Sequence, residues 1–172
     1  MAYIPSFYKI MESYIFKLKS LSDTQDFGHL LGSHAQAGFV YCLDGDLGAG
    51  KTTLTQAIAT GLNLSDGEYI SSPSFAIMHE YHGGIPLYHM DFYRLYSSDD
   101  VLALGFDEYF YKKGLTVIEW SKRATDILPD DILAIDMQLA EDNTRTIKLR
   151  WTPIFNSLLK EISKKFPPTH SV

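Results

Sequence analysis

The stretch Gly45-Asp-Leu-Gly-Ala-Gly-Lys-Thr52 decides the fold of this 172-residue chain. It matches G-x-x-x-x-G-K-[ST], a loop whose backbone N–H groups surround phosphates. The apolar run 39–44 before it predicts a buried strand, and the apolar spacing at Leu54, Ala57 and Ile58 after it predicts a helix. Because the N-terminus of that helix adds partial positive charge, strand, loop and helix together predict a nucleoside triphosphate site.

We expect the nucleotide to contact this loop along its whole length. In such loops the lysine reaches the β- and γ-phosphates and the Ser/Thr hydroxyl binds Mg²⁺. Those positions are Lys51, which we predict to be catalytic, and Thr52, which we predict to be a metal ligand. The residues predicted to bind the nucleotide are Gly45, Asp46, Leu47, Gly48, Ala49, Gly50, Lys51, Thr52 and Thr53.

The composition limits the possible classes of function. The formal net charge is −6, whereas domains that bind nucleic acid unaided usually carry a basic surplus, so we expect no DNA partner and at most an indirect RNA role. The single cysteine, Cys42, cannot form an internal disulfide, and we expect it to be a small buried hydrophobe in a reducing compartment. No long apolar run or signal-peptide pattern is present, which predicts a soluble cytoplasmic protein without membrane contact.

Patterning along the rest of the chain predicts alternating strands and helices. We interpret 1–12 as an N-terminal extension and 13–172 as one domain, and we expect the chain to fray from Lys164 onward. One helix is expected to begin at an N-cap at Ser22. Further helices are expected after the loop, at 99–104 and at 154–162, and strands at 13–18, 39–44, 76–81, 85–90, 115–118, 132–139 and 144–150.

Two acids follow strands and are candidates for the chemistry. Asp91 comes after the strand 85–90, and Glu119 ends the β-branched run 115–118. In open α/β sheets ligands lie outside the carboxyl ends of strands, so both carboxylates could face the γ-phosphate. We predict both as catalytic residues and metal ligands, and we assign the water-orienting role to Glu119. The alternative for Asp91 is a turn or cap residue, and for Glu119 a carboxylate with a structural partner.

Other polar residues give weaker signals. Arg94 could neutralise charge in a transition state, although a surface salt bridge is the commoner role of an arginine. His79, His82 and His89 lack the matched set of ligands that zinc needs. Ser74, between Pro73 and Phe75, could belong to a loop that responds to the γ-phosphate.

Four motifs that occur in order give the chain a family resemblance. They are Gly45-Asp-Leu-Gly-Ala-Gly-Lys-Thr-Thr53, Ser72-Pro-Ser-Phe75, Tyr88-His-Met-Asp-Phe-Tyr-Arg-Leu95 and Ile118-Glu-Trp120. Together they resemble TsaE, also called YjeE, the bacterial family of ATPases in tRNA threonylcarbamoyladenosine biosynthesis. The resemblance runs from about Ser20 to Arg150. A set of motifs in order is far more specific than any one of them.

The resemblance implies a three-layer P-loop NTPase fold of the α/β class, with a mixed, mostly parallel sheet flanked by helices. It implies a Mg²⁺-dependent ATPase that is slow alone and acts with the TsaD–TsaB complex, so that tRNA is met only through that complex. It also places a nucleotide-site arginine at Arg145 and the family's tryptophan at Trp120. The chain departs from the family at Ser74, usually threonine, and at Ser121, often proline.

Two other functions use the same loop. A small-molecule kinase would need an acceptor pocket and usually an arginine-bearing lid, and the sequence has no arginine-rich insertion. A nucleotide-sensing module without turnover would keep Lys51 and Thr52 but could dispense with Glu119. No guanine-reading N-K-x-D element is evident, which favours ATP.

Overall fold

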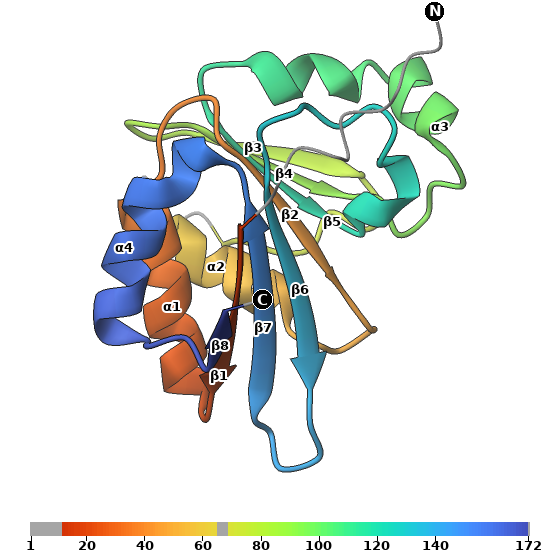
Figure 1. Ribbon diagram of the computed structural model, residues 1–172. Helices are drawn as coiled ribbons and strands as arrows, with labels where there is room; N and C mark the ends of the chain where they lie inside the picture. Colours follow the sequence, from red (N-terminus) through yellow and green to blue (C-terminus); the bar gives the residue numbers. More distant parts are fainter. Residues whose placement is uncertain (1–11, 65–68, 172) are drawn as a thin grey trace, which may run out of the picture.

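The computed structural model describes residues 12–64 and 69–171, and an α/β arrangement is built around one sheet (Figure 1). The strands are β1 (Glu12–Leu18), β2 (Val40–Gly45), β3 (Met78–Tyr81), β4 (Leu87–Asp91), β5 (Leu115–Glu119), β6 (Leu133–Leu139), β7 (Arg145–Trp151) and β8 (His170–Ser171). The helices are α1 (Leu21–Ser33), α2 (Lys51–Gly61), α3 (Ser98–Ala103) and α4 (Asn156–Lys165), with the 3-10 helices η2 (Phe106–Tyr111), η3 (Ser121–Ala124) and η4 (Pro153–Phe155).

The sheet is mixed, with strand order β3-β4-β5-β2-β6-β7-β1-β8. Parallel pairing joins β4 to β5, β5 to β2 and β2 to β6, and the remaining pairs are antiparallel. The α/β class and the mixed sheet flanked by helices are confirmed, but the expectation of a mostly parallel sheet is wrong. The chain returns from β6 to β7 through the short segment 140–144, which allows only antiparallel pairing, and β1 and β8 extend that part of the sheet.

Helices cover the two faces of the sheet unequally. Figure 1 shows α1, α2 and α4 together on one side of the sheet and α3 on the other. Along β2 the side chains alternate: Tyr41 and Leu43 belong to the core beneath α1 and α2, whereas Val40 and Cys42 belong to the core beneath α3 and η2. The sheet and the helices on its two faces therefore form three layers.

Sequence and structure agree on most elements and differ at several boundaries. The N-cap of α1 is Ser20, whose Oγ accepts a hydrogen bond from the Asp23 backbone N–H at 3.0 Å, so the predicted cap at Ser22 is wrong. β1 begins at Glu12, one residue before the predicted boundary, and the rest of the predicted extension, residues 1–11, lies outside the described residues. The predicted fraying from Lys164 is also wrong, because α4 runs to Lys165 and β8 pairs with β1. None of the helices in the described ranges is both long and apolar enough to span a membrane.

The helix that begins with the loop lysine is held against α1 by close backbone contact. A Cβ atom added at Gly32 would lie 2.0 Å from the Ile58 carbonyl oxygen, and one at Gly61 would lie 2.2 Å from the His29 carbonyl oxygen. Only glycine allows the two helices to approach this closely. The position of α2, and with it the start of the phosphate-binding helix, depends on this contact.

Gly32→Ala is expected to destabilise the protein by about 2 kcal/mol, because the new methyl group must push α1 away from α2. Urea unfolding of both proteins measures the free energy of unfolding. Gly84→Ala is the matched control, since a Cβ there meets no atom within 4 Å. Equal stability of the Gly32 and Gly84 variants would contradict the close-packing argument.

Cys42 is buried, as expected, at 1% exposure in β2. Burial raises the pKa of its thiol from 9.0 to about 12. Because the reactive form is the thiolate, the native thiol is expected to resist alkylation at pH 8, and one thiol per chain should react after unfolding in urea. Mass spectrometry of the iodoacetamide-treated protein measures this, and rapid labelling of the folded chain would show that the cysteine is accessible.

Candidate nucleotide site

The loop joins the end of a central strand to the start of a helix, as the sequence predicts. Gly45 ends β2 and Lys51 begins α2. Gly48 and Gly50 have φ values of 83° and 101°, in the left-handed region that glycine adopts without strain. The chain leaves β2 toward β3 and β4 and leaves the adjacent parallel strand β5 toward β6, in the opposite direction along the sheet, so the loop lies at a topological switch point. Ligands of α/β sheets bind at such points.

Lys51 lies across the loop. Its Nζ donates hydrogen bonds to the Gly45 and Asp46 carbonyl oxygens at 2.8 and 2.9 Å, and it lies 4.1 Å from the centre of the Trp120 ring. Burial lowers the pKa of its ammonium group, and the negative charges of Glu119 and Asp91 oppose this shift. The cation is thus placed between the loop and the two predicted acids.

The two acids lie side by side at the carboxyl edge of the sheet, which confirms their predicted placement. Asp91 and Glu119 are register partners of the parallel strands β4 and β5, and they are only 4% and 2% exposed. The Thr52 hydroxyl is 3.0 and 3.1 Å from the two Glu119 carboxylate oxygens. A hydroxyl and a carboxylate therefore meet at the position where the sequence predicts a metal.

Asp91 is tied to the Ser72–Phe75 segment. Its Oδ2 accepts a hydrogen bond from Ser72 Oγ at 2.6 Å, and its Oδ1 accepts one from the Tyr93 backbone N–H at 2.9 Å. The second bond is that of a turn-forming aspartate, which was the alternative role for this residue. The first bond connects the segment to the site. Asp91 therefore combines a position beside Glu119 with a structural role.

His89 is a site residue that the sequence reasoning missed. Its ring is 0% exposed, and its Nε2 is 2.9 Å from Glu119 Oε1. Its Nδ1 is buried and has no partner in the described part of the chain. Strand alternation was the available signal, because His89 lies two residues before Asp91 and so on the same face of β4. From the sequence, His89 was considered only as a zinc ligand.

An open pocket of about 440 Å³ lies over the loop and the acids. Ser74 and Arg94 line it, and the Arg94 guanidinium lies 4.1 Å from the centre of the Phe75 ring. Arg145 lies beside Gly50, where an added Cβ would be 3.2 Å from its Nε, but it is not among the residues that line the pocket. The loop residues that line the pocket are Leu47, Gly48, Gly50, Lys51, Thr52 and Thr53. The predicted residues Gly45, Asp46 and Ala49 form the loop behind it.

Within the described ranges, no group of three or more His, Cys, Asp or Glu side chains is arranged to hold a metal ion by itself. Magnesium differs from zinc in this respect, since it is commonly held by one or two carboxylates together with substrate phosphates. Thr52 and Glu119, with Asp91 beside them, offer this kind of partial ligand set.

Loop, strand order and acids define a P-loop protein of the α/β class. Comparison with known proteins gives the family. Residues 18–147 match the family model described as "Threonylcarbamoyl adenosine biosynthesis protein TsaE". The chain belongs to the TsaE family.

Individual relatives agree with this assignment. The tRNA threonylcarbamoyladenosine biosynthesis protein TsaE of Bacillus subtilis is 41% identical over 126 residues, which cover 73% of this chain and 77% of that protein. The protein of the same name from Treponema pallidum is 39% identical over 75% of this chain and 94% of its own length. The crystal structure of Bacillus subtilis YdiB is similar with a TM-score of 0.77 and 33% identity, covering 91% of this chain and 97% of that one.

Proposed function

We propose that this chain is a small Mg²⁺-dependent ATPase required for N6-threonylcarbamoyladenosine modification of tRNA, and that it hydrolyses ATP in conjunction with the TsaD–TsaB complex. The observation that carries the proposal is the contact of Glu119 with Thr52, next to Lys51, at the start of the phosphate-binding helix. Family membership supports the biological setting, since its relatives are named for this tRNA modification.

The residues fit a bound nucleoside triphosphate. Lys51 lies along the loop, where its ammonium group can exchange its bonds to the Gly45 and Asp46 carbonyl oxygens for bonds to the β- and γ-phosphates. Thr52 and Glu119, with Asp91 beside them, are the residues that would hold Mg²⁺, and the ion would neutralise charge on the phosphates. Arg145, next to Gly50, would add a second cation beside the loop.

Glu119 is the residue proposed to act on the attacking water. Its carboxylate is 2% exposed, so few waters compete for it, and a carboxylate in this position can accept a hydrogen bond from the water that attacks in line. His89 and Thr52 contact the same carboxylate and limit its rotation. Asp91, fixed by Ser72, supplies the second negative charge at the metal position.

The contacts of the loop also explain why turnover would be slow without a partner. Lys51 is bonded to two carbonyl oxygens, and the Thr52 hydroxyl is bonded to Glu119. Nucleotide and metal must replace these bonds before hydrolysis. A partner complex that stabilises the rearranged site would therefore raise the rate.

The partner assignment is tested by a pull-down of purified TsaD and TsaB with this chain, with and without ATP. We expect capture of both proteins, with an amount that depends on the nucleotide. A Glu161→Gln variant serves as the control, because Glu161 is on α4 and its partner is the surface residue Lys164. Absence of TsaD and TsaB under both conditions would refute the partner assignment.

The kinase and sensor alternatives are separated from the ATPase by the fate of the γ-phosphate. Labelled ATP is expected to yield free inorganic phosphate. Label on a small metabolite would identify a kinase. Bound ATP that is never cleaved, alone or with TsaD–TsaB, would identify a sensor without turnover.

A further inference from the structure

The turn that follows Glu119 has a backbone conformation that needs support. Trp120 has φ of 60° and ψ of 38°, the left-handed region that an aromatic residue rarely adopts. Such conformations persist only where neighbouring contacts hold them, and they cluster at functional sites. Here the strained residue directly follows the proposed catalytic acid, and its ring lies under the Lys51 ammonium group.

The support comes from the residue immediately before the phosphate loop. Asp44 Oδ2 accepts a hydrogen bond from Ser121 Oγ at 2.6 Å, and Asp44 Oδ1 accepts one from the Lys122 backbone N–H at 3.2 Å. Asp44 and Ser121 are 7% and 2% exposed. One buried carboxylate thus binds two consecutive residues beyond the strained turn, and hydrogen bonds to a buried charge are among the stronger ones in proteins.

These bonds connect the two halves of the site. Asp44 precedes Gly45, so it moves with the entry to the phosphate loop, whereas Ser121 follows the strand that carries Glu119. The Trp120 backbone N–H donates to the Leu43 carbonyl oxygen at 2.9 Å, one further link between the same two segments. The Tyr93 ring also packs against the Trp120 ring, with ring centres 5.1 Å apart.

We propose that Asp44 and Ser121 are positioning residues that hold the turn at Trp120 and thereby fix Trp120 and Glu119 relative to Lys51 and Thr52. Neither Asp44 nor Ser121 is among the residues that line the pocket, so both would act through the residues that they hold. Their effect on turnover rests on the proposed ATPase function, whereas their effect on the orientation of Trp120 does not.

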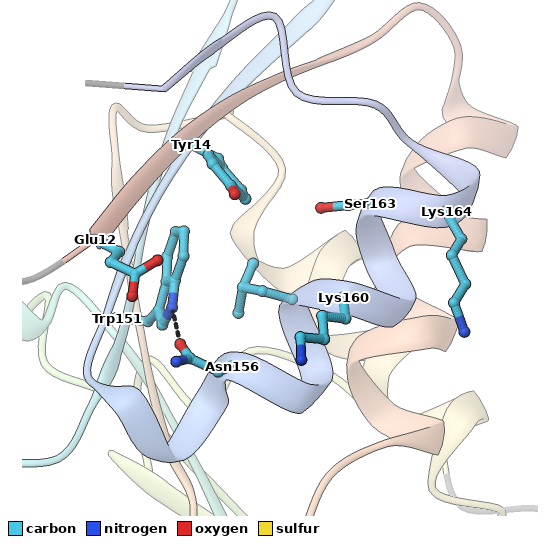
Figure 2. A pocket seen from close by; sticks show the side chains of 8 residues that line it. Glu12, Tyr14, Trp151, Asn156, Lys160, Ser163 and Lys164 are labelled. Carbon is cyan, nitrogen blue, oxygen red and sulfur yellow. Dashed lines mark hydrogen bonds between the residues drawn. The ribbon is translucent and has the colours of Figure 1, made fainter.

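The test is a double-mutant cycle with Ser121→Ala, Asp44→Ala and the double variant. Steady-state hydrolysis over a range of ATP concentrations gives kcat and KM. Acrylamide quenching of tryptophan fluorescence reports Trp120, because the second tryptophan, Trp151, is 1% exposed and its Nε1 donates a hydrogen bond to Asn156 Oδ1 (Figure 2). Thr116→Val is the matched control: it removes a buried hydroxyl bond, from Thr116 to the Tyr109 carbonyl oxygen, on the same strand as Glu119.

Ser121→Ala is expected to lower kcat about tenfold, to leave KM within about threefold, and to make Trp120 more quenchable. The double variant should be no worse than Asp44→Ala alone, since Asp44→Ala already removes the bond that Ser121→Ala breaks. Thr116→Val should lose thermal stability without these effects. Wild-type quenching in Ser121→Ala, or independent effects that simply multiply in the double variant, would overturn the proposal. If the wild-type chain does not hydrolyse ATP even together with TsaD–TsaB, the proposed function fails, and the quenching cycle still decides this inference.

Discussion

Glu119→Gln is expected to bind ATP with nearly the wild-type dissociation constant and to hydrolyse it at least about 100-fold more slowly. Glutamine has the same size and can still accept the hydrogen bond from Thr52 at one oxygen, so the pocket should keep its shape. It lacks the negative charge that orients and partly deprotonates the attacking water. A variant that loses kcat but not binding has lost an interaction of the transition state.

Calorimetric titration with ATP and a phosphate-release assay measure the two quantities separately. Glu161→Gln is the matched control, because it neutralises a carboxylate whose partner Lys164 is on the surface of α4. We expect that control to behave as wild type in both assays. Unchanged turnover in Glu119→Gln would refute the proposed role of Glu119.

Lys51→Ala is expected to weaken ATP binding by at least about 100-fold and to abolish turnover at ordinary ATP concentrations. The ammonium group would make charge-assisted hydrogen bonds to the β- and γ-phosphates, and two bonds of this kind contribute about 3–6 kcal/mol. The ammonium group must give up its bonds to the Gly45 and Asp46 carbonyl oxygens, and this offsets part of the contribution, so the expected loss is set at the lower end of the range.

The dissociation constant of ATP, measured by the same titration, tests this expectation. Lys164→Ala is the control, since Lys164 is an exposed lysine that pairs with Glu161 on the same helix. ATP affinity within about threefold of wild type in Lys51→Ala would show that the lysine does not contact the phosphates.

Local patterns in the sequence predicted the parts of the fold that place the site. The apolar run before Gly45 and the helical spacing after Thr52 gave β2, the loop and α2, and both acids were expected at the carboxyl ends of their strands. Each of these predictions depends on residues within one element or on the common direction of parallel strands.

Contacts between distant segments were not predictable in the same way. The pairing of β8 with β1 joins the two ends of the described chain, and no local pattern marks it. The bond from Ser121 to Asp44 spans 77 positions, and it is visible only once β2 and β5 are adjacent. The cap of α1 was expected at Ser22, and the hydrogen bond from the Asp23 N–H to Ser20 Oγ places it two residues earlier. The roles of Asp91, Glu119 and Arg145 remain predictions.

The measurement that tests the central claim most directly is phosphate release from ATP by this chain, by the TsaD–TsaB complex, and by the two together at equal concentrations. We predict that the mixture releases phosphate clearly faster than the sum of the separate rates, and that Glu119→Gln in the mixture removes this gain. A mixture that only reaches the sum of its parts would contradict the account of a partner-coupled ATPase.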